Sequence, residues 1–196
     1  MLDQQALDTL FRQARSHNGW LDRPVTDEQL RAIYELCRWG PSSGNSCPMR
    51  LIFVRTGEAR ERLLPWLAQG NIDKVRQAPV TAILGYDQQF YRALPRLFAH
   101  NPEFGKRFED PQNAEHTQET AFRNASLQAA YLMLAARGLG LDCGPLSGFD
   151  AAGVDATFWA GTTVRTNFLC CLGYGDSSKL FARLPRLEFD EVCQLQ

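Results

Sequence analysis

The feature that most constrains the fold is a long apolar segment, residues 118–137, followed directly by a glycine-rich stretch, residues 138–150. The apolar segment has almost no polar face, which predicts a helix that is buried on all sides. Four glycines then occur within eleven residues, and they let a backbone or a flat ligand approach closely. We therefore expect a buried central helix, ended by Gly138 or Gly140, that leads into a rigid loop.

The glycine-rich stretch also places hydrogen-bond donors. Pro145 stiffens it and has no N–H, whereas Leu146, Ser147 and Gly148 keep theirs. Asp150 is positioned to cap a following helix through its side-chain oxygen. Such an edge suits an oxyanion hole, a phosphate cradle or a clamp on a flat ring. It also suits a plain turn between two helices.

Length and charge exclude several classes of protein. The chain has 196 residues, which predicts a single domain. Its net charge of −1 gives no support to binding of nucleic acid or of an anionic membrane surface. No apolar run is long enough to span a bilayer, and the first residues do not resemble a signal peptide. We therefore expect a cytoplasmic protein without nucleic-acid or membrane partners.

The six cysteines form no Cys-x-x-Cys pair, and the three histidines are far apart in the sequence, so we expect no metal site. In a reducing compartment the thiols are expected to remain free, and most act as small buried hydrophobes. Cys143 differs from the others because it lies in the glycine-rich stretch, where a catalytic thiol is the alternative to a buried one.

Hydrophobic periodicity predicts the remaining elements. Thr26 and Gln29 form a capping box for a helix that stops at Trp39. Prolines interrupt a segment of mixed aromatic and basic residues at 87–117, which is either an excursion that packs on a partner or an ordinary pair of surface helices. Strands are expected at 51–54, 80–84 and 166–175, and further helices at 3–14, 58–68, 71–74 and 151–159. The irregular order of strands and helices favours an α+β layer fold over a doubly wound sheet.

Two catalytic motifs are only superficially present. Gly138-x-Gly140-x-x-x-Gly144 is similar to a dinucleotide fingerprint, but it follows a helix rather than a strand. Ser147 lacks the strand-to-helix context of a hydrolase nucleophile.

Ala14-Arg15-Ser16 offers a guanidinium and a hydroxyl to an anion, or else forms a solvated loop. These residues alone predict a soluble α+β domain with an anion site.

Five motifs in order resemble the FMN-dependent nitroreductase family over nearly the whole chain. They are Ala14-Arg15-Ser16, Pro41-Ser42-Ser43-Gly44-Asn45-Ser46, Asn71-x-x-Lys74, Gly138 to Asp150, and Arg183-Leu184-Pro185. Residues 16–20, 120–124 and 173–180 resemble the branch that contains the malonic semialdehyde reductase of pyrimidine degradation. The resemblance implies one domain, residues 1–196, folded as a three-layer α/β/α sandwich with a mostly antiparallel central sheet. It also implies a domain-interlocked homodimer.

The resemblance assigns a role to each motif. It places Arg15, Ser16 and Arg183 at the FMN phosphate, and Asn71 and Lys74 at the pyrimidine end of the flavin ring. Pro145, Leu146, Ser147 and Gly148 would lie along the ring, with a backbone N–H near N5. Pro41, Ser42, Ser43 and Asn45 would reach the flavin from the other subunit.

The chain also departs from the family pattern. Basic residues that are common in the family are replaced by Ala14, Asn18 and Phe181, and Lys179 is a candidate to compensate. Many nitroreductases have a glutamate where this chain has Ser147.

These roles imply an FMN oxidoreductase that takes electrons from NADPH or NADH and passes them to a small substrate in a ping-pong cycle. The branch implies reduction of malonic semialdehyde to 3-hydroxypropionate. Cations available to such an anionic substrate are Arg92, Arg96, Lys106, Arg107 and Arg123. The alternatives are a general nitro- or quinone reductase, a protein that stores FMN without turnover, and an interaction domain without a cofactor.

Overall fold

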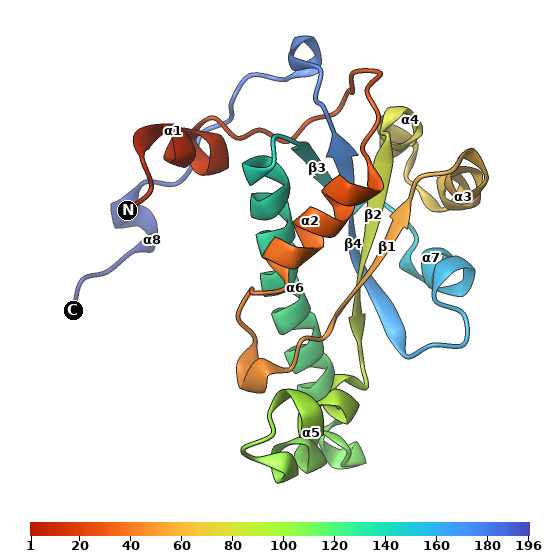
Figure 1. Ribbon diagram of the computed structural model, residues 1–196, viewed down its shortest axis with the longest axis vertical. Coiled ribbons are helices and arrows are strands. Elements are labelled where there is room, and N and C mark those ends of the chain that lie inside the picture. Colours follow the sequence, from red (N-terminus) through yellow and green to blue (C-terminus); the bar gives the residue numbers. More distant parts are fainter.

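The computed structural model describes residues 1–196 and centres on a four-stranded antiparallel sheet with strand order β1-β2-β4-β3 (Figure 1). The strands are β1 (Met49–Val54), β2 (Val80–Asp87), β3 (Asp142–Leu146) and β4 (Val164–Gly173). β2 is buried at every residue but the last, because it lies inside the sheet and is covered on both faces. β1 and β3 form the two opposite edges.

Helices cover both faces of the sheet and give three layers, as predicted (Figure 1). On one face, α2 (Asp27–Cys37) packs on α6 (Ala114–Gly138), around a core that contains Ile33 and Leu132. The other face carries a second core, which includes Leu63 and Val75, under α3 (Gly57–Leu63), α4 (Ile72–Gln77) and α7 (Ala151–Phe158).

Local signals start two of these helices as expected. The Thr26 hydroxyl accepts from Gln29 N, and the Gln29 side chain accepts from Thr26 N, so the capping box of α2 is confirmed. Asp150 caps α7 by accepting from Ala152 N at 3.0 Å. The second cap fixes where the chain turns after β3.

The prediction that the apolar helix is buried on all sides is wrong for the single chain. α6 is 25 residues long, and it turns a row of small residues and Leu132 toward the sheet. Its outer face exposes Phe122 (47%), Leu127 (46%) and Tyr131 (41%). Apolar composition alone does not distinguish burial in the chain's own core from burial against another surface.

The glycine-rich stretch is not only a loop, because residues 142–146 form β3. Glycine, aspartate and proline are poor strand formers, so the local sequence did not indicate a strand. The strand conformation is instead stabilised by pairing with β4, in which Cys143 lies opposite Leu172 and Pro145 opposite Cys170. Proline is tolerated because β3 is an edge strand and its missing N–H points away from β4.

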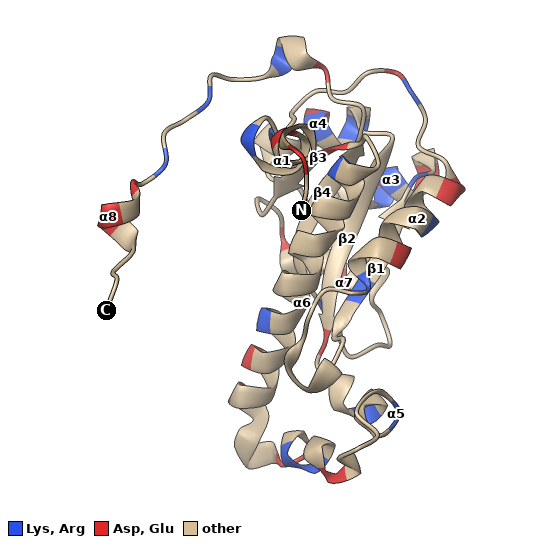
Figure 2. Ribbon diagram, turned by 60° about the vertical axis from the view of Figure 1, so that its left-hand side comes forward, with Lys and Arg blue, Asp and Glu red and all other residues tan.

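The two chain ends differ: the N-terminal segment contacts α6, where Arg137 Nη1 donates to the Leu10 carbonyl at 3.4 Å, whereas the C-terminal tail extends away from the main body. The predicted helix at 3–14 consists of α1 (Gln4–Leu7) and a π-helical turn (Asp8–Arg12), and it buries no residue. Residues 181–196 are exposed throughout and run away from the body to α8 (Phe189–Val192), with basic residues marking the first part of this tail (Figure 2).

The predicted excursion at 87–117 is a set of short helices, including α5 (Leu94–Leu97), at one end of α6 (Figure 1). It is tied to the core by Phe90, Leu94 and Phe108, which are at most 4% exposed. No helix in the chain is both long and apolar enough to cross a membrane.

Candidate functional site

A continuous line of polar groups lies along the outer edge of β3. Cys143 and Pro145 are two residues apart on the strand, so their carbonyls point to the same side, away from β4. The Cys143 carbonyl accepts from His17 N at 2.9 Å, and the Pro145 carbonyl accepts from Lys74 Nζ at 3.2 Å. The N-terminal motif and α4 are therefore brought together along one strand.

Asn71 and Gly148 form one end of this line. Asn71 Nδ2 donates to the Gly148 carbonyl at 2.9 Å, and Ala68 N donates to the same oxygen at 2.9 Å. A Cβ atom at Gly148 would lie 2.6 Å from Asn71 Nδ2, so the position requires glycine or a shift of the amide. The N–H groups of Ser147 and Gly148 donate to no protein group. Two unused amide donors thus lie next to Asn71.

Lys74 is a buried cation close to those donors. It is 8% exposed, and it forms no ion pair with a carboxylate within 4.0 Å. Burial lowers the pKa of its ammonium group, because desolvation disfavours the charged form. A Cβ atom at Gly144 would lie 2.8 Å from Lys74 Cε, so the bare glycine lets the lysine stem cross β3. A buried, unpaired ammonium favours an electron-rich ligand beside it.

The other end of the line gathers basic side chains from the two termini. Arg15 Nη2 donates to the Phe181 carbonyl at 2.5 Å, and Arg183 Nη2 donates to the Ala14 carbonyl at 3.1 Å. Neither guanidinium has a carboxylate partner. Ser16 lies beside them, because it forms a β-bridge with Cys143. Arg15, Ser16 and Arg183 therefore form one cluster.

Asn18 and Lys179 lie beside this cluster. They line a common cavity of about 470 Å³, which Phe181 also lines. The Lys179 stem packs on Gly19, where a Cβ atom would lie 2.7 Å from Lys179 Cγ. The structure thus gathers the three predicted phosphate residues at one end of β3, with Asn18 and the candidate compensating cation Lys179 beside them.

The predicted loop Pro41, Ser42, Ser43 and Asn45 is not part of this line. It leads into β1, at the opposite edge of the sheet (Figure 1). Ser43 N donates to Asn124 Oδ1 on α6 at 2.8 Å, and Asn45 Nδ2 donates to the Leu97 carbonyl at 2.9 Å. Within one chain these residues cannot meet Lys74. The side chain of Leu146 is buried in the core, so this residue offers only its backbone.

His17 is a site residue that sequence reasoning missed. Its side chain is buried, and its Nε2 lies 3.3 Å from Asp142 Oδ1 at the start of β3. Its Nδ1 is buried without a hydrogen-bond partner and packs on Gly175, where a Cβ atom would lie 1.9 Å away. The residue joins the N-terminal motif to β3 and to the end of β4. A histidine inside an anion-binding motif was the available signal, but its partner is distant in the sequence.

Comparisons with known proteins identify the family of the chain. Residues 11–174 match the model of the nitroreductase family. The chain belongs to this family. The match includes Arg15, Lys74 and Ser147, whereas Lys179 and Arg183 lie outside it, so their place in the site rests on the geometry above.

Two curated relatives of the nitroreductase family match along almost their full length. A protein of Cupriavidus pinatubonensis, provisionally named NADH dehydrogenase/NAD(P)H nitroreductase, is 54% identical over 195 residues and covers 100% of both chains. HadB of Ralstonia pickettii, which carries the same provisional name, is 55% identical over 190 residues, or 97% of each chain.

Solved structures share the fold at lower identity. The nitroreductase ydfN of Bacillus subtilis superposes with a TM-score of 0.89 at 22% identity, over 99% of this chain and 100% of that one. A nitroreductase of Exiguobacterium sibiricum, solved in complex with FMN, gives a TM-score of 0.84 at 17% identity, over 100% and 99% of the two chains.

Proposed function

We propose that the protein is an FMN-dependent oxidoreductase that uses NADH or NADPH as its reductant. The observation that carries this proposal is the buried, unpaired Lys74 beside the free amides of Ser147 and Gly148. At the other end of the same strand edge lies the basic cluster of Arg15 and Arg183. An elongated ligand with an electron-accepting ring at one end and an anion at the other matches this arrangement.

The dimensions and charges fit FMN. At about 3.3 Å per residue, Cys143, beside Ser16, and Ser147 are about 13 Å apart along the chain. The free N–H groups of Ser147 and Gly148 offer two backbone hydrogen-bond donors to the polar atoms of the ring. A terminal phosphate carries a charge of about −1.5 to −2, which suits two arginines without carboxylate partners. The FMN complex of the Exiguobacterium protein and the NAD(P)H nitroreductase names of the two relatives support the same cofactor and reductants.

Each part of the site then has a chemical task. FMN, when bound, supplies the hydride chemistry, and the protein supplies position and field. Arg15, Ser16 and Arg183 hold the phosphate. Lys74 stabilises negative charge at the pyrimidine edge, where a fixed cation in a water-poor site acts most strongly. The amides of Ser147 and Gly148 fix the ring by donating hydrogen bonds.

For the substrate we propose malonic semialdehyde, reduced to 3-hydroxypropionate, on the basis of the branch resemblance. Ser147, in place of the family's common glutamate, avoids a carboxylate beside an anionic substrate. Among the candidate cations, Lys106 pairs with Glu103, Arg123 pairs with Glu119, and Arg107 stacks on Phe104 and Phe108. Arg92 and Arg96 are the two without such partners, so they are the better candidates.

We further propose that the protein is a homodimer with interlocked subunits. The outer face of α6 exposes the large apolar residues Phe122, Leu127 and Tyr131. The tail also exposes large apolar side chains, those of Phe181, Leu184, Leu187, Phe189, Val192 and Leu195. A second copy would cover both surfaces. It would also bring its Pro41–Asn45 loop to a site that this loop cannot reach in its own chain.

A general nitro- or quinone reductase is the second candidate, because both curated relatives carry the nitroreductase name. Steady-state oxidation of NADPH with malonic semialdehyde, a nitroaromatic and a quinone distinguishes the two. The semialdehyde is expected to give the highest kcat/KM. If it gives the lowest, the general reductase replaces the proposed one. If no acceptor supports turnover by the flavin-loaded protein, FMN storage without catalysis is favoured.

A further inference from the structure

Asp142, the first residue of β3, joins two segments that are far apart in the sequence. Its Oδ1 lies 3.3 Å from His17 Nε2, and its Oδ2 accepts from Gly175 N at 2.9 Å. No lysine or arginine lies within 4.0 Å of this carboxylate, although it stands at the basic end of the strand edge. An unpaired carboxylate repels the anion that the arginines attract, so its presence there calls for an explanation.

The two segments that Asp142 joins carry the two halves of the basic cluster. Arg15 lies two residues before His17, and Arg183 lies eight residues after Gly175. Each arginine donates to a backbone carbonyl of the other segment, at 2.5 and 3.1 Å respectively. Because both side chains are long, the backbone that carries them determines where the two guanidinium groups meet an anion.

Backbone hydrogen bonds also connect these segments. His17 N donates to the Cys143 carbonyl at 2.9 Å, and Asp176 N donates to the Gly19 carbonyl at 3.0 Å. These bonds hold both segments near β3 without the carboxylate. Replacement of Asp142 is therefore expected to shift the segments relative to each other and not to unfold the chain.

The buried ring of His17 gives the contact with Asp142 a direction. The residue is 6% exposed, and its Nδ1 has no hydrogen-bond partner. A hydrogen on Nδ1 would be a buried donor without an acceptor, so neutral His17 favours the hydrogen on Nε2, which faces Asp142. A Cβ atom at Gly175 would lie 1.9 Å from Nδ1, so the ring fits between Asp142 and a bare glycine.

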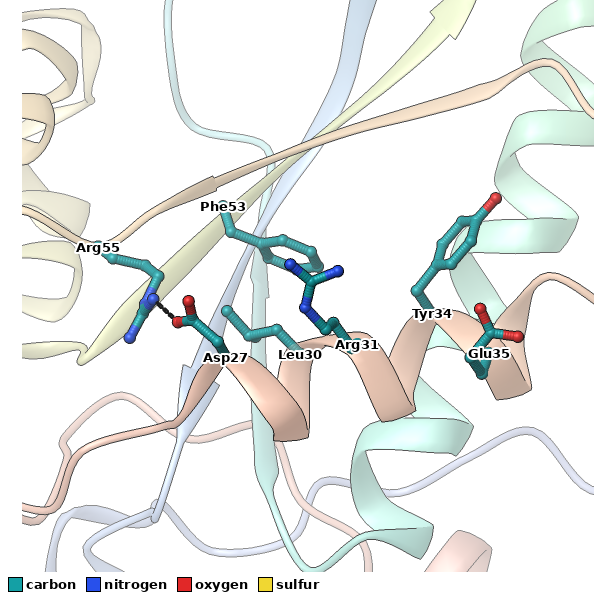
Figure 3. A pocket seen from close by; sticks show the side chains of 7 residues that line it. All are labelled: Asp27, Leu30, Arg31, Tyr34, Glu35, Phe53 and Arg55. Carbon is teal, nitrogen blue, oxygen red and sulfur yellow. Dashed lines mark hydrogen bonds and ion pairs between the residues drawn. The ribbon is translucent and has the colours of Figure 1, made fainter.

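Asp27 shows how a surface acid of the same chain differs. It lines a groove of about 680 Å³ between α2 and β1, where it pairs with Arg55 (Figure 3). Both side chains of that pair are exposed, so the pair contributes little to stability. The groove lies toward β1, at the edge of the sheet opposite β3. Asp27 is therefore a suitable control, because it joins no two segments at the basic cluster.

We propose that Asp142 is a positioning residue that aligns the basic cluster with the FMN phosphate, a role that rests on the proposed function. By holding His17 and Gly175 at the start of β3, it places Arg15 and Arg183 on one phosphate. Charge and position have opposite effects here. By charge alone, loss of the carboxylate strengthens binding of a phosphate dianion, whereas loss of alignment weakens it. The sign of the change in affinity separates the two.

The test compares FMN with riboflavin, which has the same ring system and no phosphate. The full-length protein, freed of bound flavin, is titrated with each ligand, and quenching of flavin fluorescence gives the two Kd values. Asp142→Asn is expected to raise the Kd for FMN about threefold to tenfold, the range for one lost hydrogen bond, and to leave the Kd for riboflavin unchanged. A general loss of stability would weaken both ligands alike.

A second variant perturbs the same contact from the other side. Gly175→Ala places a Cβ atom against the ring of His17, so it is expected to give the same selective loss of FMN affinity. Two controls are expected to leave both Kd values unchanged. Gly57→Ala adds a Cβ atom that meets nothing within 4 Å, and Asp27→Asn removes a carboxylate at the opposite edge of the sheet.

The role of Asp142 is overturned if Asp142→Asn binds FMN as tightly as the wild type or more tightly, or if it weakens riboflavin by the same factor. In these cases the wild type still binds FMN, so the proposed function stands. A wild-type protein that binds neither flavin overturns the proposed function, and the role of Asp142 with it.

Discussion

Replacement of Arg183 tests the phosphate end of the proposed cofactor site. The side chain is exposed, and its only hydrogen bond goes to the Ala14 carbonyl, so Arg183→Ala leaves the core intact. A hydrogen bond to a charged group is worth about 1.5–3 kcal/mol. Because solvent screens an exposed guanidinium, we expect a loss near the lower bound, about 1.5 kcal/mol, or about tenfold in the Kd for FMN.

The assay is a fluorescence titration of the apo-protein with FMN. Arg186→Ala is the matched control, because Arg186 lies in the same tail but donates only to the carbonyls of its neighbours Leu184 and Pro185. We expect this control to bind FMN like the wild type. An unchanged Kd in Arg183→Ala, or an equal loss in Arg186→Ala, would refute the assignment of Arg183 to the phosphate.

Three further predictions concern the ring, the dimer and the core. Lys74→Met is expected to make the reduction potential of the bound flavin more negative, because the buried cation no longer stabilises the reduced ring. An unchanged potential in a redox titration would argue against that role of Lys74. Leu127 lies on the exposed face of α6, so Leu127→Asp is expected to give a folded monomer by light scattering. Leu132 is fully buried, so Leu132→Asp is expected to unfold the chain. If Leu127→Asp still forms a dimer, α6 is not part of the interface. Burial raises the pKa of the Cys37 thiol from 9.0 to about 11, so the stability it contributes is complete below pH 9 and is lost as the pH rises toward 11. Urea unfolding is expected to show a decrease of about 2 kcal/mol between these values that is missing in Cys37→Ala, and equal pH slopes in the two proteins would contradict it.

The local sequence predicted the helices whose first residues are set by their own capping side chains. The capping box of α2 and the Asp150 cap of α7 are set by side chains within three residues of each helix start. The strand state of β3 was missed because it depends on pairing with β4, which lies about twenty residues further along the chain. The exposed face of α6 was missed for a related reason, since composition shows that a helix is apolar but not what covers it.

The site shows the same limit. The motifs around Arg15, Lys74 and Ser147 could be found from the sequence because each is short and contiguous. Their arrangement along one strand edge depends on contacts such as Lys74 Nζ to the Pro145 carbonyl, which no spacing predicts. His17 was missed because its importance comes from its contact with Asp142, which is distant from it in the sequence.

The visible absorbance spectrum of the purified protein, with mass spectrometry of the cofactor released on denaturation, tests FMN binding most directly. We expect a yellow protein with flavin bands that releases FMN and not FAD. A colourless protein that does not take up FMN on reconstitution, or one that releases FAD, would contradict the proposed function.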